Sequence, residues 1–294
     1  MEPRPTIADL PLANGDVIRL SERVHIMGIL NVTPDSFSDG GRFFDVEDAL
    51  KQGIALAEEG ADVIDIGGES TRPGAEPVEI AEEIRRVVPV IEALTETISV
   101  PISVDTMKAE VAEAAVDAGA AIVNDVSAGR FDRAMLPFVA ARGVPVVLMH
   151  MLGEPRTMQA SPEYGDVTGE IRAFLAARAS AAREAGLPPE KIVVDPGFGF
   201  GKTREHNLEL LRDFNRFGGL GYAVLAGTSR KSFIGASLDL PVGERLEGTA
   251  ATVALAVVGG AAIVRVHDVG PMRRVTSMVE AVLRVTSPGA ERER

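Results

Sequence analysis

The sequence predicts a (β/α)8 barrel, in which eight parallel strands close into a cylinder inside a ring of helices. Eight short runs rich in Val and Ile recur along the chain, and Ala-, Glu- and Arg-rich segments with apolar residues at helical spacing separate them. Within 294 residues each strand–helix unit has roughly 30 residues, which suits a barrel of about 250 residues. An open doubly wound sheet would show the same alternation. We prefer the barrel because of the number of strands and because no linker divides the chain.

The predicted strands are continuously apolar, which is typical of parallel strands buried on both faces. In chain order they are His25–Asn31, Asp62–Ile66, Val100–Asp105, Ala121–Asp125, Val144–His150, Lys191–Asp195, Tyr222–Ala226 and Ala261–His267. Before the first strand, Thr6–Ser21 are expected to form a short hairpin that plugs the bottom of the barrel. The chain is therefore expected to be one domain, with an extension over residues 1–22, the barrel over 23–286 and a frayed polar tail over 287–294.

The segments between the strands carry apolar residues on one helical face. The predicted helices include Val46–Glu59, Pro77–Glu96, Ala109–Ala118, Gly169–Ala185 and Glu244–Val258. Several helical segments end in glycine just before the next strand, at Gly60, Gly119, Gly143 and Gly186. Glycine is a common helix stop because it readily adopts the left-handed backbone conformation.

The composition excludes several function classes. Thirty basic residues against 43 acidic ones give a formal charge of -13, which disfavours phosphate backbones and anionic lipid surfaces. The chain has no cysteine, so disulfides, thiolate nucleophiles and cysteine-ligated metals are excluded. No secretory signal is legible at the N-terminus, and no apolar run reaches the ~18 residues of a membrane span. We expect a cytoplasmic protein with no nucleic-acid or membrane partner.

Polar residues follow the apolar runs at the point where each predicted strand ends. They are Asn31, Asp65, Asp105, Asn124, Asp125, His150, Asp195, Thr228, Ser229, His267 and Asp268. Each alone could cap a helix or shape a turn. In a barrel, however, the carboxyl ends of the strands share one rim, where catalytic groups collect. We therefore expect these side chains to surround one pocket.

Three loops at this rim carry further polar groups. Asn31–Arg42 is long enough to fold over the pocket as a lid, and Gly67–Gly74 offers hydroxyls and an arginine beside glycine backbone. Gly227–Ser232 places Lys231 where an ammonium could meet an anion or a carbonyl. A Schiff-base lysine, as in an aldolase-like barrel, is an alternative role for Lys231.

Asp195–Thr203 looks like a phosphate-binding loop, but the spacing between its glycines and the Gly-Lys-Thr end is one residue too short. Nucleotide hydrolysis is therefore improbable. The four histidines are scattered and form no His-x-x-x-His pair, which argues against a histidine-rich metal site. The oxygen ligands of the rim instead suit Mg²⁺ held partly by a substrate phosphate.

Two longer motifs resemble the signatures of the dihydropteroate synthase family. They are Met27–Gly41, which reads MGILNVTPDSFSDGG, and Gly67–Gly74, which reads GGESTRPG. Shorter motifs resemble the same family in the same order: Ser103–Thr106, Val123–Asp125, His150–Met151, Asp195–Lys202, Ser229–Lys231 and Arg265–Asp268. The resemblance covers residues 24–285.

This resemblance implies a (β/α)8 barrel that joins (7,8-dihydropterin-6-yl)methyl diphosphate to 4-aminobenzoate, with release of pyrophosphate and formation of 7,8-dihydropteroate. It further implies that Mg²⁺ assists and that the protein is a homodimer packed through its later helices. Two alternatives remain open. One is a pterin-binding methyltransferase domain that uses methyltetrahydrofolate, and the other is a pterin-binding barrel without catalytic activity.

The resemblance also implies the pterin contacts. Asp195 would accept hydrogen bonds from the 2-amino group and N3–H of the pterin, a two-donor edge that a carboxylate can bind bidentately. Asp105 and Asn124 would complete the hydrogen bonds of the ring. The remaining pterin contacts would come from Met149 and Phe200, which sandwich the ring, and from Gly227, Lys231 and Arg265.

For the other groups, the resemblance implies a diphosphate site of Arg265, His267 and a Mg²⁺ ion held by Asn31, which together supply positive charge within an acidic protein. The expected 4-aminobenzoate contacts are Phe37, Thr71, Pro73, Lys231 and Ser232, with Asp39 and Arg72 ordering the two loops. The residues expected to carry catalysis are Asp105, Lys231, Arg265 and His267. Because a neutral arylamine already has its lone pair at pH 7, we expect pyrophosphate to leave before the amine attacks.

Overall fold

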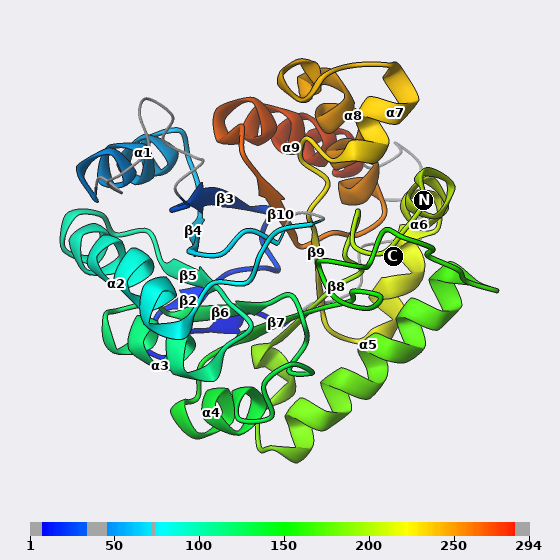
Figure 1. The fold of residues 1–294 in the computed structure, drawn as a ribbon. Helices are drawn as coiled ribbons and strands as arrows, with labels where there is room; N and C mark the ends of the chain where they lie inside the picture. Colours follow the sequence, from blue (N-terminus) through cyan, green and yellow to red (C-terminus); the bar gives the residue numbers. More distant parts are fainter. Residues whose placement is uncertain (1–7, 34–45, 72–73, 286–294) are drawn as a thin grey trace, which may run out of the picture.

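Eight parallel strands form a closed barrel at the centre of the computed structural model, which describes residues 8–33, 46–71 and 74–285. Figure 1 shows the helices arranged around these strands. The strands are β3 (His25–Asn31), β4 (Val63–Gly67), β5 (Ile102–Asp105), β6 (Ile122–Asp125), β7 (Val146–Met149), β8 (Ile192–Asp195), β9 (Ala223–Ala226) and β10 (Ile263–Val266). They pair in chain order and β10 closes the cylinder against β3. The predicted barrel is confirmed, and each strand lies within a residue or two of its predicted bounds.

The α-helices of the described residues follow the strands as crossovers. They are α1 (Val46–Glu58), α2 (Ile80–Thr97), α3 (Ala109–Asp117), α4 (Met135–Arg142), α5 (Val167–Glu184), α6 (Arg204–Arg212), α7 (Ser232–Leu238), α8 (Leu246–Val258) and α9 (Val269–Leu283). Short 3-10 helices lie at Pro189–Lys191, Phe214–Leu220 and Val242–Glu244.

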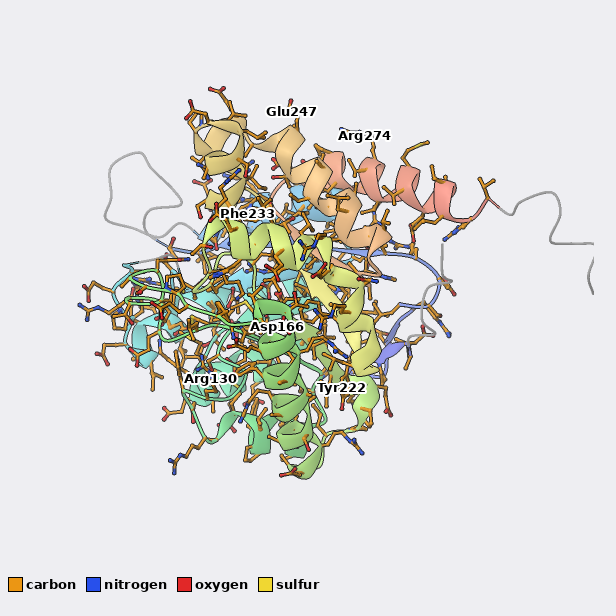
Figure 2. All side chains as sticks on the ribbon, turned by 90° about the vertical axis from the view of Figure 1, so that its right-hand side faces the viewer. Arg130, Asp166, Tyr222, Phe233, Glu247 and Arg274 are labelled. Carbon is orange, nitrogen blue, oxygen red and sulfur yellow. The ribbon has the colours of Figure 1, made fainter. Side chains whose placement is uncertain are left out.

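Local chemistry explains where helices begin and end. Helix α5 starts two residues before its predicted start because the Asp166 carboxylate accepts from the Gly169 backbone N–H, 2.9 Å away. Figure 2 marks this start of α5 with the label on Asp166. The glycines predicted to stop helices do so: Gly60, Gly119, Gly143 and Gly186 all have positive φ, between 62° and 115°.

A small antiparallel hairpin covers the bottom of the barrel, as predicted. Strands β1 (Leu10–Pro11) and β2 (Val17–Ile18) pair, and their region buries Leu10, Leu12, Ile18 and Leu20 against the amino-terminal ends of the barrel strands. This hairpin covers the amino-terminal end of the barrel, opposite the rim that carries the predicted polar residues. No helix among the described residues is both long and apolar enough to cross a membrane.

Strand register brings the predicted polar residues to one level. Gly67 of β4 lies beside Asp105 of β5, and Met149 of β7 lies beside Asp195 of β8. These residues all end their strands, so the closed barrel arranges them around a single rim.

Candidate active site

Arg265 joins two acidic residues at the rim. Its Nε donates to Asp65 Oδ2 at 2.6 Å and its Nη2 donates to Asp105 Oδ2 at 2.7 Å. Strand β10 carries the arginine, while β4 and β5 carry the carboxylates, so closure of the barrel is what lets them meet. Its Nη1 group makes no hydrogen bond within the described residues, and so can face a ligand.

Asp65 contacts two of the predicted site residues, although its sequence position indicated no role beyond the end of a strand. It is fully buried, and its Oδ2 also accepts from Asn124 Nδ2 at 2.9 Å. That bond orients the Asn124 amide, leaving its oxygen for another donor. One feature of the sequence does point to Asp65, since it is a carboxylate inside the otherwise apolar run Val63–Gly67. Such a group is costly to bury without partners, so it is expected to have them.

Burial dominates the electrostatics of Asp105. Burial raises the pKa of Asp105 to about 7, although the Arg265 guanidinium acts in the opposite direction, and the Asp65 carboxylate raises it further. Asp105 can therefore carry or release a proton near neutral pH.

Asp195 lies at the end of β8 and is 5% exposed. Its Oδ1 accepts from the Gly197 backbone N–H at 2.7 Å. Burial raises the pKa of Asp195 to about 6, opposed by that hydrogen bond and by Lys231, Lys202 and Arg265. A Cβ on Gly227 would lie 3.9 Å from Asp195 Oδ2 and 4.0 Å from Arg265 Cβ, so glycine there keeps open the space between the two groups.

A cluster of apolar side chains lies beside the polar groups of the rim. Met149 and Phe200 belong to one buried cluster with Val126, Met151 and Met158. Lys231 Nζ lies 4.1 Å from the centroid of the Phe200 ring, a cation–π contact. The site thus combines flat apolar surface with hydrogen-bonding groups, which suits a planar heterocycle.

His267 is paired with Ser229 rather than with a carboxylate. Ser229 Oγ accepts from the His267 backbone N–H at 3.2 Å and lies 3.0 Å from His267 Nδ1. If the Ser229 hydroxyl donates its proton to Nδ1, a neutral His267 ring carries its own proton on Nε2. Burial lowers the pKa of His267 to about 3, helped by Arg265 and Arg230. A neutral His267 ring can still donate a hydrogen bond from Nε2, and the predicted place of His267 in the diphosphate site stays a prediction.

Asn31 ends β3 beside a small open space. A Cβ on Gly67 would lie 3.8 Å from Asp105 Oδ2 and 3.9 Å from Asn31 Oδ1. Because glycine leaves this space empty, an ion or a ligand oxygen could approach the Asn31 amide oxygen. The described residues contain no cluster of three or more His, Asp or Glu side chains that could hold a metal by themselves.

Glu69 of the Gly67–Gly74 loop belongs to a partly buried ionic network, and Thr71 of the same loop is half-buried. Lys108 Nζ contacts the carboxylate of Glu69 and donates to Glu83 Oε2 at 2.5 Å. Thr106 donates to the other oxygen of Glu83 at 2.7 Å. Phe37, Asp39, Arg72 and Pro73 lie outside the described residues, whereas Ser232 is exposed at the first position of α7, next to Lys231.

The structure thus brings Asp105, Asn124, Asp195 and Arg265 together with Asp65. The apparent phosphate-binding loop does not act as one, because Lys202 is buried against backbone carbonyls and does not face the rim.

Comparison with known proteins identifies strong similarities. The family model "Pterin binding enzyme" matches residues 27–267. A dihydropteroate synthase of Synechocystis is 49% identical over 264 residues, which cover 90% of this chain and 91% of the relative. The structure of Xanthomonas albilineans dihydropteroate synthase with 4-aminobenzoic acid matches with a TM-score of 0.89 and 47% identity, over 97% of this chain and all of the other. A complex of the Xanthomonas albilineans enzyme with 7,8-dihydropteroate matches with a TM-score of 0.85 and 44% identity, over 95% of this chain and all of the other.

Proposed function

The chain belongs to the dihydropteroate synthase family of pterin binding enzymes, and from this premise we propose how its residues carry out the reaction. It is a transferase that condenses (7,8-dihydropterin-6-yl)methyl diphosphate with 4-aminobenzoate to give 7,8-dihydropteroate and pyrophosphate. The observation that carries the account is the guanidinium of Arg265 held between Asp65 and Asp105 at the rim that also carries Asp195. We also propose a cytoplasmic location, as expected of a biosynthetic step on small molecules.

The pterin binds at Asp195. In its ionised form this carboxylate accepts from the pterin 2-amino group and N3–H, two donors side by side. Asn124 offers its amide oxygen and Asp105 a further hydrogen-bonding group, while Met149 and Phe200 enclose the faces of the ring. Lys231 donates to the oxygen and nitrogen on the other edge of the pterin.

The diphosphate lies toward Arg265. Nη1 of Arg265 and the Nε2–H of His267 donate to its oxygens. Mg²⁺ fits this end of the site, because the space beside Gly67 opens onto the Asn31 amide oxygen and because Mg²⁺ commonly takes most of its ligands from phosphate and water. When bound, it would neutralise negative charge on the leaving group.

The 4-aminobenzoate binds on the loop side. Thr71, Ser232 and Lys231 contribute from the described residues, and Phe37 and Pro73 complete the pocket, with Asp39 and Arg72 ordering the loops. We propose that the C–O bond of the pterin methylene breaks first and that its electron pair leaves with pyrophosphate. The amine nitrogen then attacks the methylene cation and loses a proton to water. This order needs no strong base, only stabilisation of the departing anion.

The reaction is tested by measuring pyrophosphate release from the pterin diphosphate with Mg²⁺, with and without 4-aminobenzoate, while dihydropteroate is followed by chromatography. We expect the two products to form in equal amounts. Pterin binding without any turnover would favour a non-catalytic barrel. Methyl transfer from methyltetrahydrofolate to a corrinoid would favour the methyltransferase alternative.

We propose that the enzyme is a homodimer packed through α7–α9. Within the described residues, most exposed large apolar side chains lie in this region: Leu238, Val242, Leu246, Leu255, Val258, Met278, Val282 and Val285. Met278 and Val282 are four residues apart on α9 and Leu255 and Val258 are three apart on α8, so each pair shares a helix face. Figure 2 shows these two helices beside each other, marked by Glu247 and Arg274.

Introducing charge into this surface is expected to dissociate the dimer. We predict that Met278→Glu combined with Val282→Glu converts a two-chain species into a one-chain species in analytical ultracentrifugation, because buried unpaired charges are costly in an interface. Leu208→Glu, on the exposed side of α6 outside this surface, is the control and is expected to leave the mass unchanged. A charged double variant that stays dimeric would rule out this face.

A further inference from the structure

Lys202 is a buried amine side chain that the reaction above does not use. The residue is only 3% exposed and forms no ion pair with a carboxylate within the described residues. Its Nζ lies 2.8 Å from the Gly197 carbonyl oxygen, 2.9 Å from the Phe200 carbonyl oxygen and 3.0 Å from His150 Nδ1. Burying an amine without partners is costly. The hydrogen bonds to these partners therefore offset the free-energy cost of burying Lys202.

The three contacts can form in either charge state of Lys202. An ammonium donates to both carbonyls and to the His150 ring nitrogen. A neutral amine donates to the carbonyls and accepts from a protonated Nδ1. Burial lowers the pKa of Lys202 well below its usual range, and burial together with Lys202 lowers the pKa of His150 to about 2. The hydrogen bonds can therefore form whether Lys202 is charged or neutral, because a neutral His150 ring can carry its proton on Nε2 or on Nδ1.

The hydrogen bonds of Lys202 connect parts of a tight loop, residues 197–202. Gly197, Gly199 and Gly201 all have positive φ, between 63° and 79°. A Cβ on Gly197 would lie 2.0 Å from the His150 carbonyl oxygen, so the loop backbone touches the end of β7 directly. Lys202 lies between these two segments and binds both.

The two carbonyls nearest Lys202 Nζ belong to residues beside the proposed pterin site, whereas the third, that of His150, is 3.5 Å away. Gly197 also donates its N–H to Asp195 Oδ1 at 2.7 Å, and Phe200 carries the ring that faces Lys231. A shift of either peptide would displace the acceptor for the pterin edge or the wall beside its face.

We propose that Lys202 is a positioning residue for the pterin, which through the Gly197 and Phe200 carbonyls holds Asp195 and the Phe200 ring in their binding positions. The inference rests on the proposed function, because it takes Asp195 and Phe200 as pterin contacts. It also explains why a Gly-Lys-Thr segment occurs here without binding phosphate: the lysine points into its own loop.

The test compares the KM values of the two substrates in Lys202→Met, which retains an unbranched apolar chain and removes every donor. We expect KM for the pterin diphosphate to rise roughly tenfold or more, because small displacements of a binding group are costly, and KM for 4-aminobenzoate to change by less than about twofold. KM does not depend on the concentration of active enzyme, so partial misfolding cannot produce this result. Tyr164→Phe is the matched control, since it removes a 2.9 Å bond to Gly201 at the far end of the same loop, and is expected to leave both KM values nearly unchanged.

Two variants of His150 test the same inference through the hydrogen bond between Lys202 and His150, in case Lys202→Met does not fold. His150→Asn retains an acceptor oxygen near the position of Nδ1 and is expected to preserve the pterin KM, whereas His150→Leu removes the acceptor and is expected to raise it. An unchanged pterin KM in His150→Leu and in any folded Lys202→Met would overturn the inference. A wild-type enzyme that forms no dihydropteroate would instead contradict the proposed function.

Discussion

Replacing Asp195 by asparagine is expected to abolish pterin binding and yet to leave the protein as stable as before, or more so. The asparagine amide places a donor against one of the two pterin donors. Two hydrogen bonds to a charged group are together worth roughly 3–6 kcal/mol, which corresponds to about two to four powers of ten in affinity. Calorimetry with the pterin diphosphate would measure this loss. Asp48→Asn, on the exposed surface of α1, is the control and should bind normally.

The stability gain follows from the sign of the pKa shift. Burial raises the pKa of Asp195 to about 6, above the value of about 3.9 for an unfolded aspartate. The native state therefore binds this proton more tightly than the unfolded state does. Its contribution to the free energy of unfolding is present at pH 4 and is lost as the pH rises through 6. Asparagine cannot ionise, so the stability of Asp195→Asn relative to wild type should increase between pH 4 and pH 7.

The same ionisation should govern pterin binding by the wild type. A protonated Asp195 cannot accept both pterin donors, so affinity should fall as the pH is lowered through about 6. Thermal melts and calorimetry across this range check both expectations. Normal pterin affinity in Asp195→Asn would remove Asp195 from the pterin site.

Replacing Arg265 by methionine is the second change with a large expected effect. Loss of one group that stabilises developing negative charge typically lowers kcat by about 10²–10³. The substitution also removes the guanidinium that pairs with Asp65 and Asp105. Breaking a buried ion pair by removing one partner costs roughly 3–5 kcal/mol of stability. The destabilisation should be greatest above about pH 7, where Asp105 is ionised, and should shrink as acid protonates Asp105.

A second substitution separates the two consequences of losing Arg265. Asp65→Asn in the Arg265→Met background removes one buried charge, so it should recover stability without recovering kcat. Arg265→Lys retains a cation and should lose less activity than Arg265→Met. If Arg265→Met folds and turns over at the wild-type rate, Arg265 has no part in expelling pyrophosphate.

The barrel and much of the rim were predictable from the sequence, because both depend on local pattern. Continuous apolar runs ending in Asp105, Asn124 and Asp195 identify strands and place those residues at a common edge. Asp65 was harder to assign, because its role depends on contacts with Asn124 and Arg265, which come from distant segments.

Other features depend on burial or on backbone direction, which sequence patterns do not reveal. The lowered pKa of His267 results from its burial and from the nearby guanidinium groups of Arg265 and Arg230. Lys202 lies in a segment that resembles a phosphate loop, and only the positive φ angles of its glycines turn the lysine inward. The predicted roles of Phe37, Asp39, Arg72 and Pro73 stay predictions, since these residues lie outside those that the structure describes.

We propose that charge at the rim, and not a base, drives the reaction, so that pyrophosphate leaves before the amine attacks. The most direct test uses substrate with heavy oxygen in the bridge between the pterin methylene and the first phosphorus, incubated with enzyme and Mg²⁺ without 4-aminobenzoate. Departure, rotation and return of the diphosphate should move the label into non-bridging positions of the recovered substrate, as detected by phosphorus NMR. A label that stays in the bridge, together with strict dependence of pyrophosphate release on the amine, would show that pyrophosphate does not leave before the amine attacks.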